Sequence, residues 1–115
     1  MVEKFQVQFL EETVEFLESI DEKAREKVIY NIHKAKFIND NELFKKLNDN
    51  IWEFRTLYNK TYYRLFAFWD KTDNKETVVI AANGIVKKSD KTHKGEIRKA
   101  ERIRKLYFES KSNEK

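Results

Sequence analysis

The chain contains no cysteine and no proline, and only two of its 115 residues are glycine. Without cysteine it can form no disulfide and offers no thiolate ligand to a metal. It has two histidines, His33 and His93, which lie far apart in the sequence and argue against a transition-metal site. No apolar run approaches the roughly 20 residues needed to cross a bilayer, and the first residues include acids where a secretory signal would be apolar. We therefore expect a cytoplasmic protein with no cofactor, no metal and no membrane partner.

Several motifs of known chemistry are also missing. The sequence contains no glycine-rich phosphate loop, no nucleophile elbow and no paired-carboxylate signature. What it does contain is 40% hydrophobic residues with clear periodicity, which is enough for one packed core. We predict a single domain over residues 1–109, followed by a polar tail over residues 110–115 that frays.

Positive charge is concentrated near one end of the chain. Residues 87–105 carry nine Lys or Arg against three acids, a balance of +6, whereas the whole chain carries +4. The first fifty residues carry eight basic against eleven acidic side chains, a balance of −3. Concentrated charge attracts a polyanion more strongly than the same charge spread evenly, so nucleic acid is the first candidate partner.

The hydrophobic periodicity changes along the chain between the strand and helix patterns. The expected order is β-α-α-β-β-β-α, an α+β fold with a small, curved, mainly antiparallel sheet, an N-terminal helical hairpin and a C-terminal basic helix. The predicted elements are a strand over residues 4–9, a helix over 10–20, a second helix capped by Asp21, a helical turn over 42–47, strands over 51–58, 61–70 and 76–86, and a helix from about residue 92. The predicted buried stripes are Leu10, Val14, Leu17 and Ile20 in the first helix, Ala24, Val28, Ile32 and Ala35 in the second, and Ile97, Ala100, Ile103 and Tyr107 in the last.

A two-residue turn at Asn59 and Lys60 fixes a hairpin register. Counting back from this turn places Arg55 opposite Arg64. Like charges directly opposite each other destabilise a sheet by a few tenths of a kcal/mol up to roughly 1 kcal/mol. A phosphate between the two guanidiniums would turn that repulsion into charge-assisted contacts. The alternatives are that both arginines splay into water or that Glu53 neutralises one of them.

Basic residues follow the last predicted strand. Lys87, Lys88 and Lys91 stand at its end, where site residues are common, although a solvated basic loop gives the same pattern. His93 lies in the same segment and has the side chain for general acid or base chemistry near neutral pH. The aromatic residues of the preceding strand are expected to form core, with one tyrosine open to stacking on a base.

Three segments carry a resemblance to a known family. They are WEFR at 52–55, YYRLFAF at 62–68 and IAANGIVKKSDKTHKGEIRKAERIRKLYF at 80–108. Together they resemble the HigB-like branch of the RelE/ParE toxin superfamily, the toxin halves of bacterial type II toxin–antitoxin pairs. The third segment is the most specific, and the N-terminal strand and helical hairpin also suit the family.

The resemblance implies a RelE-like fold and ribosome-dependent cleavage of mRNA in the ribosomal A site. It implies attack of an RNA 2′-hydroxyl on the adjacent phosphate, a cyclic phosphate product and no metal. The positions that match the family's basic site are Arg55, Arg64, Lys87 and Lys88. It also implies a cognate antitoxin, here expected to be of the helix-turn-helix type. The residues predicted to contact RNA are Lys88, Lys91, Lys94 and Arg98.

Two features depart from the family pattern. Many relatives have proline after the Lys-Thr pair, where this chain has His93, and a helix replaces the catalytic Tyr or His that several RelE-type toxins carry after the last strand. The identity of the general base therefore stays open. A lysine or His93 could serve, or catalysis could depend on positioning and charge alone. Two other functions also fit the sequence: a ParE-type inhibitor of DNA gyrase, and a nucleic-acid-binding module without enzymatic activity.

Overall fold

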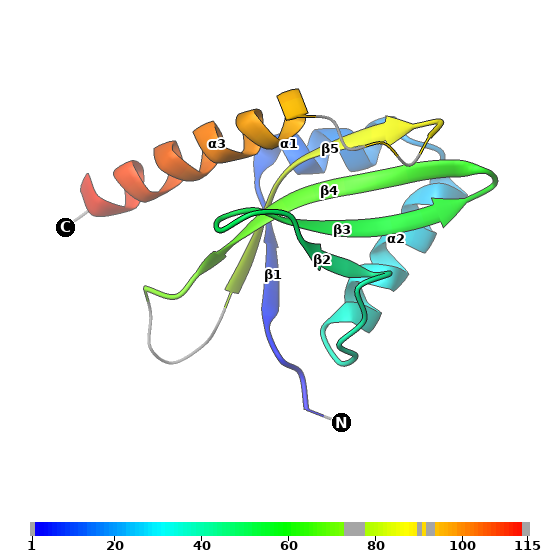
Figure 1. Cartoon of the computed structure of the whole chain (residues 1–115), viewed down its shortest axis with the longest axis horizontal. Helices are drawn as coiled ribbons and strands as arrows, with labels where there is room; N and C mark the ends of the chain where they lie inside the picture. The colour runs from blue at the N-terminus through cyan, green and yellow to red at the C-terminus, as the bar shows by residue number, and fades with distance from the viewer. Residues whose placement is uncertain (1, 73–77, 90, 92–93, 114–115) are drawn as a thin grey trace.

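The structure is a computed structural model that describes residues 2–72, 78–89, 91 and 94–113. Within these residues five strands form one mixed sheet in the order β1-β5-β4-β3-β2 (Figure 1). In chain order the elements are β1 (Gln6–Phe9), α1 (Glu11–Ser19), α2 (Glu22–Ala35), β2 (Phe44–Lys46), β3 (Trp52–Tyr58), β4 (Thr61–Asp70), β5 (Val78–Lys87) and α3 (Lys94–Asn113). Only the β1–β5 pair is parallel. The predicted α+β class, helical hairpin and C-terminal helix are confirmed.

Each face of the sheet has its own core. Leu17 of α1 and Val28 of α2 pack with Leu65 of β4 on one face, here called the hairpin face. Ala100 of α3 packs with Phe66 and Phe68 of β4 on the other, here called the α3 face. Side chains alternate along β4, so this strand contributes residues to both cores, as expected for a central strand covered on both sides.

The helical hairpin is held by a cap at each side of its loop. The Asp21 carboxylate accepts hydrogen bonds from the backbone N–H groups of Lys23 and Ala24, which confirms the predicted cap. Arg25 Nε donates to the Leu17 carbonyl at 2.6 Å and so satisfies the C-terminal end of α1. The predicted stripe of α2 is buried throughout.

The apolar face of α1 differs from the prediction. Val14 is 41% exposed, while Thr13 is fully buried. The Thr13 hydroxyl donates to the Ala81 carbonyl of β5 at 2.9 Å, so a hydrogen bond to the sheet sets the rotation of the helix.

The β3–β4 hairpin has the predicted register. Asn59 and Lys60 both have positive φ, as a two-residue turn of type I′ requires. Tyr58 pairs with Thr61, and Arg55 stands directly opposite Arg64.

A bulge in β5 changes which of its side chains face α3. Phe66 pairs with Asn83, but Ala67 pairs with Ala81, so Ala82 is an extra residue. As a result Ala82 and Asn83 both belong to the α3 side, and the alternation after them continues in the new phase to Lys87, which stands opposite Tyr62. The bulge therefore brings Lys87, and not Lys88, to the face that carries Arg64.

The strand β5 also needs glycine at one position. A Cβ atom built on Gly84 would lie 2.5 Å from a ring carbon of Phe16 and 2.6 Å from a methyl of Leu65. Glycine thus allows α1 to approach β5 directly behind the bulge.

Asp70 fastens α3 to the end of β4. Its carboxylate accepts hydrogen bonds from the Tyr107 hydroxyl at 2.5 Å and from Lys111 Nζ at 2.7 Å, and also from the hydroxyl of Thr72 at 2.6 Å. Burial raises the pKa of this carboxyl, but hydrogen bonds from Lys111, Thr72 and Tyr107 outweigh it and hold the pKa well below its usual range.

One predicted element is of the wrong type, and the last helix is longer than predicted. The predicted helical turn over residues 42–47 is instead the edge strand β2, because Phe44 stacks on Phe54 with ring centroids 4.3 Å apart. The helix α3 continues to Asn113, and Lys111 pairs with Asp70, so α3 includes residues that the prediction assigned to the polar tail. In the described part of the chain, no helix is both long and apolar enough to cross a membrane.

Candidate functional site

The paired arginines of the hairpin lie on the α3 face with a carboxylate between them. Glu53 is two residues before Arg55 on β3 and so shares its face. Its Oε1 lies 3.4 Å from Arg55 Nε and 3.5 Å from Arg64 Nε. The sequence analysis allowed Glu53 to neutralise one arginine. In the structure the Glu53 carboxylate contacts both arginines.

Burial makes this cluster electrostatically strong. Glu53 and Arg64 are each 3% exposed, and the side chain of Arg55 is 16% exposed. Charges removed from water in this way interact more strongly with each other and with any charged ligand than charges in solvent do. Two guanidiniums and one carboxylate together carry a formal charge of +1, and all three side chains are largely removed from solvent.

Lys87 and Tyr62 extend the cluster across β4 to β5. They are cross-strand partners, and they stand diagonally next to Arg64 on the same face. The Arg64 guanidinium lies over the Tyr62 ring at 5.0 Å from its centroid, a cation–π contact. Lys87 is 4% exposed. The structure thus brings together three of the predicted catalytic residues, from three adjacent strands.

Asn83 ties this cluster to the first turn of α3. Its Nδ2 donates to the carboxylate of Glu96 at 3.1 Å and to the backbone carbonyl of Glu96 at 3.3 Å. Its side chain is fully buried, and its Oδ1 has no hydrogen-bond partner among the described residues. The start of α3, with Lys94 and Arg98, is therefore fixed next to the end of β5.

The other predicted residues lie at different places. Lys88 donates to the Thr61 hydroxyl at 3.3 Å, and this contact separates it from Lys87. Lys91, Lys94 and Arg98 are exposed. His93 lies outside the described residues.

Sequence reasoning named Glu53 as a possible partner of one arginine but not as a site residue, and it missed Asn83. The position of Glu53 two residues before Arg55 was a usable signal, because residues i and i+2 of a strand share a face. Asn83 had no such signal, since its role depends on the bulge next to it. None of the described His, Asp and Glu residues gather into a group that could hold a metal ion.

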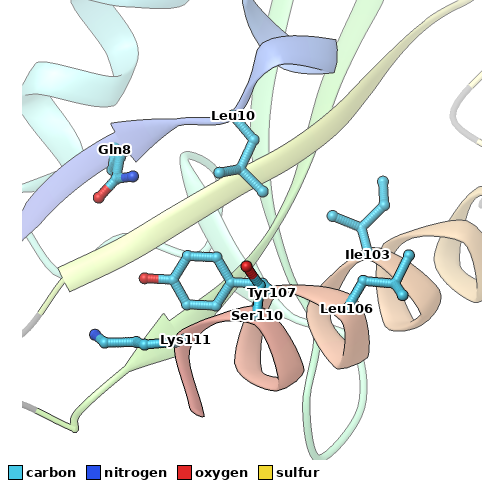
Figure 2. Close-up of a pocket in the computed structure, with 7 residues that line it drawn as sticks. All are labelled: Gln8, Leu10, Ile103, Leu106, Tyr107, Ser110 and Lys111. Atoms are coloured by element: carbon cyan, nitrogen blue, oxygen red, sulfur yellow. The ribbon is translucent and has the colours of Figure 1, made fainter. Parts of the chain in front are cut away.

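A second concave region has different chemistry. It is an apolar groove between the start of the chain and the last turns of α3 (Figure 2). Its lining residues are Gln8, Leu10, Ile103, Leu106, Tyr107, Ser110 and Lys111. The single charged residue in this lining, Lys111, is already paired with Asp70. The groove is therefore poorly suited to a phosphate, and the arginine cluster remains the candidate site.

The fold and the cluster define a small α+β protein with two arginines and a lysine gathered on one face of its sheet around a carboxylate. A family model described as "Phage derived protein Gp49-like (DUF891)" matches residues 15–105, a span that includes Glu53, Arg55, Arg64 and Lys87. The chain therefore belongs to the Gp49-like family, which is related to the RelE- and HigB-like toxin families. No curated protein and no solved structure matches the chain significantly.

Proposed function

We propose that this protein is the toxin of a type II toxin–antitoxin pair, of the HigB-like branch, and that it cleaves mRNA in the ribosomal A site. The observation that carries the proposal is the buried cluster of Arg55, Arg64 and Lys87 on one face of the sheet, beside the start of a basic helix. Membership of the Gp49-like family also supports a toxin-like function.

The chemistry proposed is a transesterification. The RNA 2′-hydroxyl loses its proton and its oxygen bonds to the adjacent phosphorus, while the bond from phosphorus to the 5′-oxygen of the next nucleotide breaks. The products are a 2′,3′-cyclic phosphate and a 5′-hydroxyl, which takes up a proton. Negative charge builds up on the phosphate in the transition state, where fixed cations stabilise it most.

Each residue of the cluster has a part in this proposal. Arg64 and Arg55 hold the phosphate oxygens, and Glu53 keeps the two guanidiniums in position between turnovers. Lys87 supplies a further cation on the same face. His93, directly before α3, is the candidate for proton transfer, and a lysine or a mechanism of positioning and charge alone are the alternatives.

The test is induction of the protein in cells followed by mapping of RNA 5′ ends. Cuts in phase with codons, confined to translated messages, are the expected result. A DNA damage response without such cuts would contradict the proposal and identify the ParE-type alternative. Binding of RNA with neither effect would identify the non-enzymatic module.

The proposed antitoxin docks on the helical hairpin, α1 and α2. Val14, Ile29 and Tyr30 are large apolar residues on these helices that are 41%, 45% and 58% exposed. The hairpin covers the face of the sheet opposite the arginine cluster. An antitoxin bound there would leave the cluster uncovered and act by making the complex too bulky for the A site.

Hydrogen exchange of the toxin alone and in complex with its antitoxin tests this docking site. Amides of α1 and α2 are expected to gain protection, because a bound partner excludes water from the exposed apolar side chains. Protection confined to residues 85–105 would instead mean that the antitoxin covers the basic surface directly.

A further inference from the structure

A second cationic pocket lies at the other end of β3 and β4 from the Asn59–Lys60 turn. It has a volume of about 320 Å³. The residues that line it are Lys46, Asp49, Asn50, Trp52, Trp69, Lys71 and Arg104. They come from β2, the loop before β3, the start of β3, the end of β4 with the residue after it, and α3, so the pocket is assembled from distant parts of the sequence.

Two tryptophans form the aromatic part of this pocket. Trp52 and Trp69 meet edge to face, with ring centroids 5.7 Å apart and planes at 82°. Both are half-buried, so part of each indole faces solvent. Lys71 Nζ lies 5.3 Å from the centroid of the Trp69 ring. Indole surfaces of this kind stack on unpaired bases without regard to sequence.

Charge distinguishes this pocket from an ordinary edge of the core. Lys46, Lys71 and Arg104 supply three positive charges against one acid, Asp49. Like charges gathered around a hollow repel one another unless an anion joins them. Cations around exposed aromatic surface are the combination with which proteins bind single-stranded nucleic acid.

We propose that this pocket binds one unpaired nucleotide of the RNA strand, with its base on the tryptophans and its phosphate on Lys46, Lys71 and Arg104. This inference rests on the proposed function for its ligand, because RNA is the substrate proposed for the arginine cluster. The pocket is a second contact point that holds the strand away from the bond that is cut.

The distance between the two sites sets the length of RNA that can reach both. Arg64 and Trp69 are five residues apart on β4, which corresponds to about 17 Å of strand, and this odd separation points their side chains to opposite faces of the sheet. A stacked nucleic acid strand advances about 3.4 Å per nucleotide, so about five nucleotides cover the distance along β4, and the path around the end of the strands needs more.

Basic residues of α3 lie between the two sites. Lys94, Arg98 and Lys105 share one side of the helix by their spacing. Glu101 lies on the same side, and its carboxylate accepts a hydrogen bond from Asn48 in the loop before β3 at 2.9 Å. This contact places that side of α3 along the pocket's own loop, so the row of cations leads from the start of α3 to the pocket.

Tryptophan fluorescence tests the proposal directly, because Trp52 and Trp69 are the two tryptophans of the chain. All indole emission therefore reports on this pocket. Addition of a single-stranded oligouridylate, without ribosomes, is expected to quench the emission in a saturable way. The double variant Lys46→Ala/Lys71→Ala is expected to bind about 25-fold more weakly at 0.1 M salt, with a log–log salt slope shallower by about 1.4, from two lost phosphate contacts at about 0.7 each.

Matched variants separate this result from general effects of charge. The double variant Lys23→Ala/Lys34→Ala removes two exposed lysines of α2 and is expected to leave the affinity nearly unchanged. With a trinucleotide, too short to reach both sites, Arg64→Ala is expected to keep the quenching. Unchanged emission on addition of RNA, or quenching that Lys46→Ala/Lys71→Ala retains in full, would overturn the proposal.

Two further comparisons show whether the ligand is RNA or a free nucleotide, and they test the pocket and the proposed nuclease function separately. If uridine monophosphate binds as tightly as a twelve-residue oligouridylate, the pocket takes free nucleotides and the RNA form of the proposal is wrong. If lysine-dependent quenching occurs but induced cells show no codon-phased cuts, the pocket stands and the proposed nuclease function fails. Codon-phased cuts without lysine-dependent quenching would overturn the pocket and leave the nuclease function standing.

Discussion

Replacing Arg64 by alanine is expected to lower the rate of RNA cleavage by about 10² to 10³, the typical effect of removing one fixed donor that stabilises transition-state charge. Arg64 is the most strongly fixed cation of the site, because it is 3% exposed, lies 3.5 Å from Glu53 and covers the ring of Tyr62. A donor fixed in this way needs no reorganisation when charge develops on the phosphate. Growth inhibition in cells is expected to disappear with the activity.

Three controls make the Arg64 result specific. Circular dichroism and thermal unfolding show whether the alanine variant folds, which matters because Glu53 loses one of its two arginines. Arg64→Lys keeps the charge but loses the planar fork, so it is expected to recover only part of the rate. Arg102→Ala, at an exposed position of α3, is expected to behave as the parent. A folded Arg64→Ala protein as toxic as the parent would exclude this residue from the site.

The largest effect on stability is expected from Asp70→Asn. The charged carboxylate of Asp70 accepts hydrogen bonds from Tyr107, Lys111 and Thr72, and it is 5% exposed. A hydrogen bond to a charged group contributes about 1.5 to 3 kcal/mol of net stability. Asparagine keeps part of this network, and Lys111 is partly exposed, so we expect a loss of about 2 kcal/mol. Chemical denaturation at neutral pH measures it. The exposed Glu26→Gln on α2 is the control.

The Asp70 effect has a defined dependence on pH. The folded protein holds the pKa of this carboxyl below its usual range, while in the unfolded chain it is about 3.9. As pH falls below about 5, the unfolded state therefore takes up the proton first and stability declines. The difference in stability between the parent and Asp70→Asn should be full near pH 7 and shrink as the pH falls through this range. A difference that stayed constant down to pH 3 would contradict the assignment.

Counting along the sequence predicts the opposed arginines, whereas the lysine beside them is assigned to their site through the family resemblance alone. Asn59 and Lys60 define a tight turn, and a tight turn fixes the pairing of Arg55 with Arg64 by counting alone. The choice between Lys87 and Lys88 depends on the extra residue Ala82. An isolated glycine such as Gly84 inside a strand is a signal for a bulge or a close approach, but it does not identify which residue is extra. One inserted residue reverses the face of every position that follows it.

The elements missed by sequence analysis depend on contacts distant along the chain. Residues 44–46 form a strand because Phe44 packs against Phe54 and Trp52, although the surrounding pattern resembles a helical turn. Likewise, α3 extends past residue 109 because Asp70, some forty residues earlier, accepts a hydrogen bond from Lys111. Periodicity describes how a segment can present one face, but it does not identify the partner that determines its end.

The parallel pairing of β1 with β5 has a consequence for how the protein is made. Gln6 pairs with Val78, and the Thr13 hydroxyl bonds to Ala81, so the first strand and helix have their sheet partners near residue 80. The chain leaves the ribosome from its N-terminus, and contacts of such long sequence separation form slowly. The pairs β3–β4 and β4–β5 join strands that are consecutive along the chain, so these partners are close in the sequence. Completion of the fold must therefore wait until most of the polypeptide has been synthesised, and a truncated chain that ends before β5 has no sheet partner for its first strand.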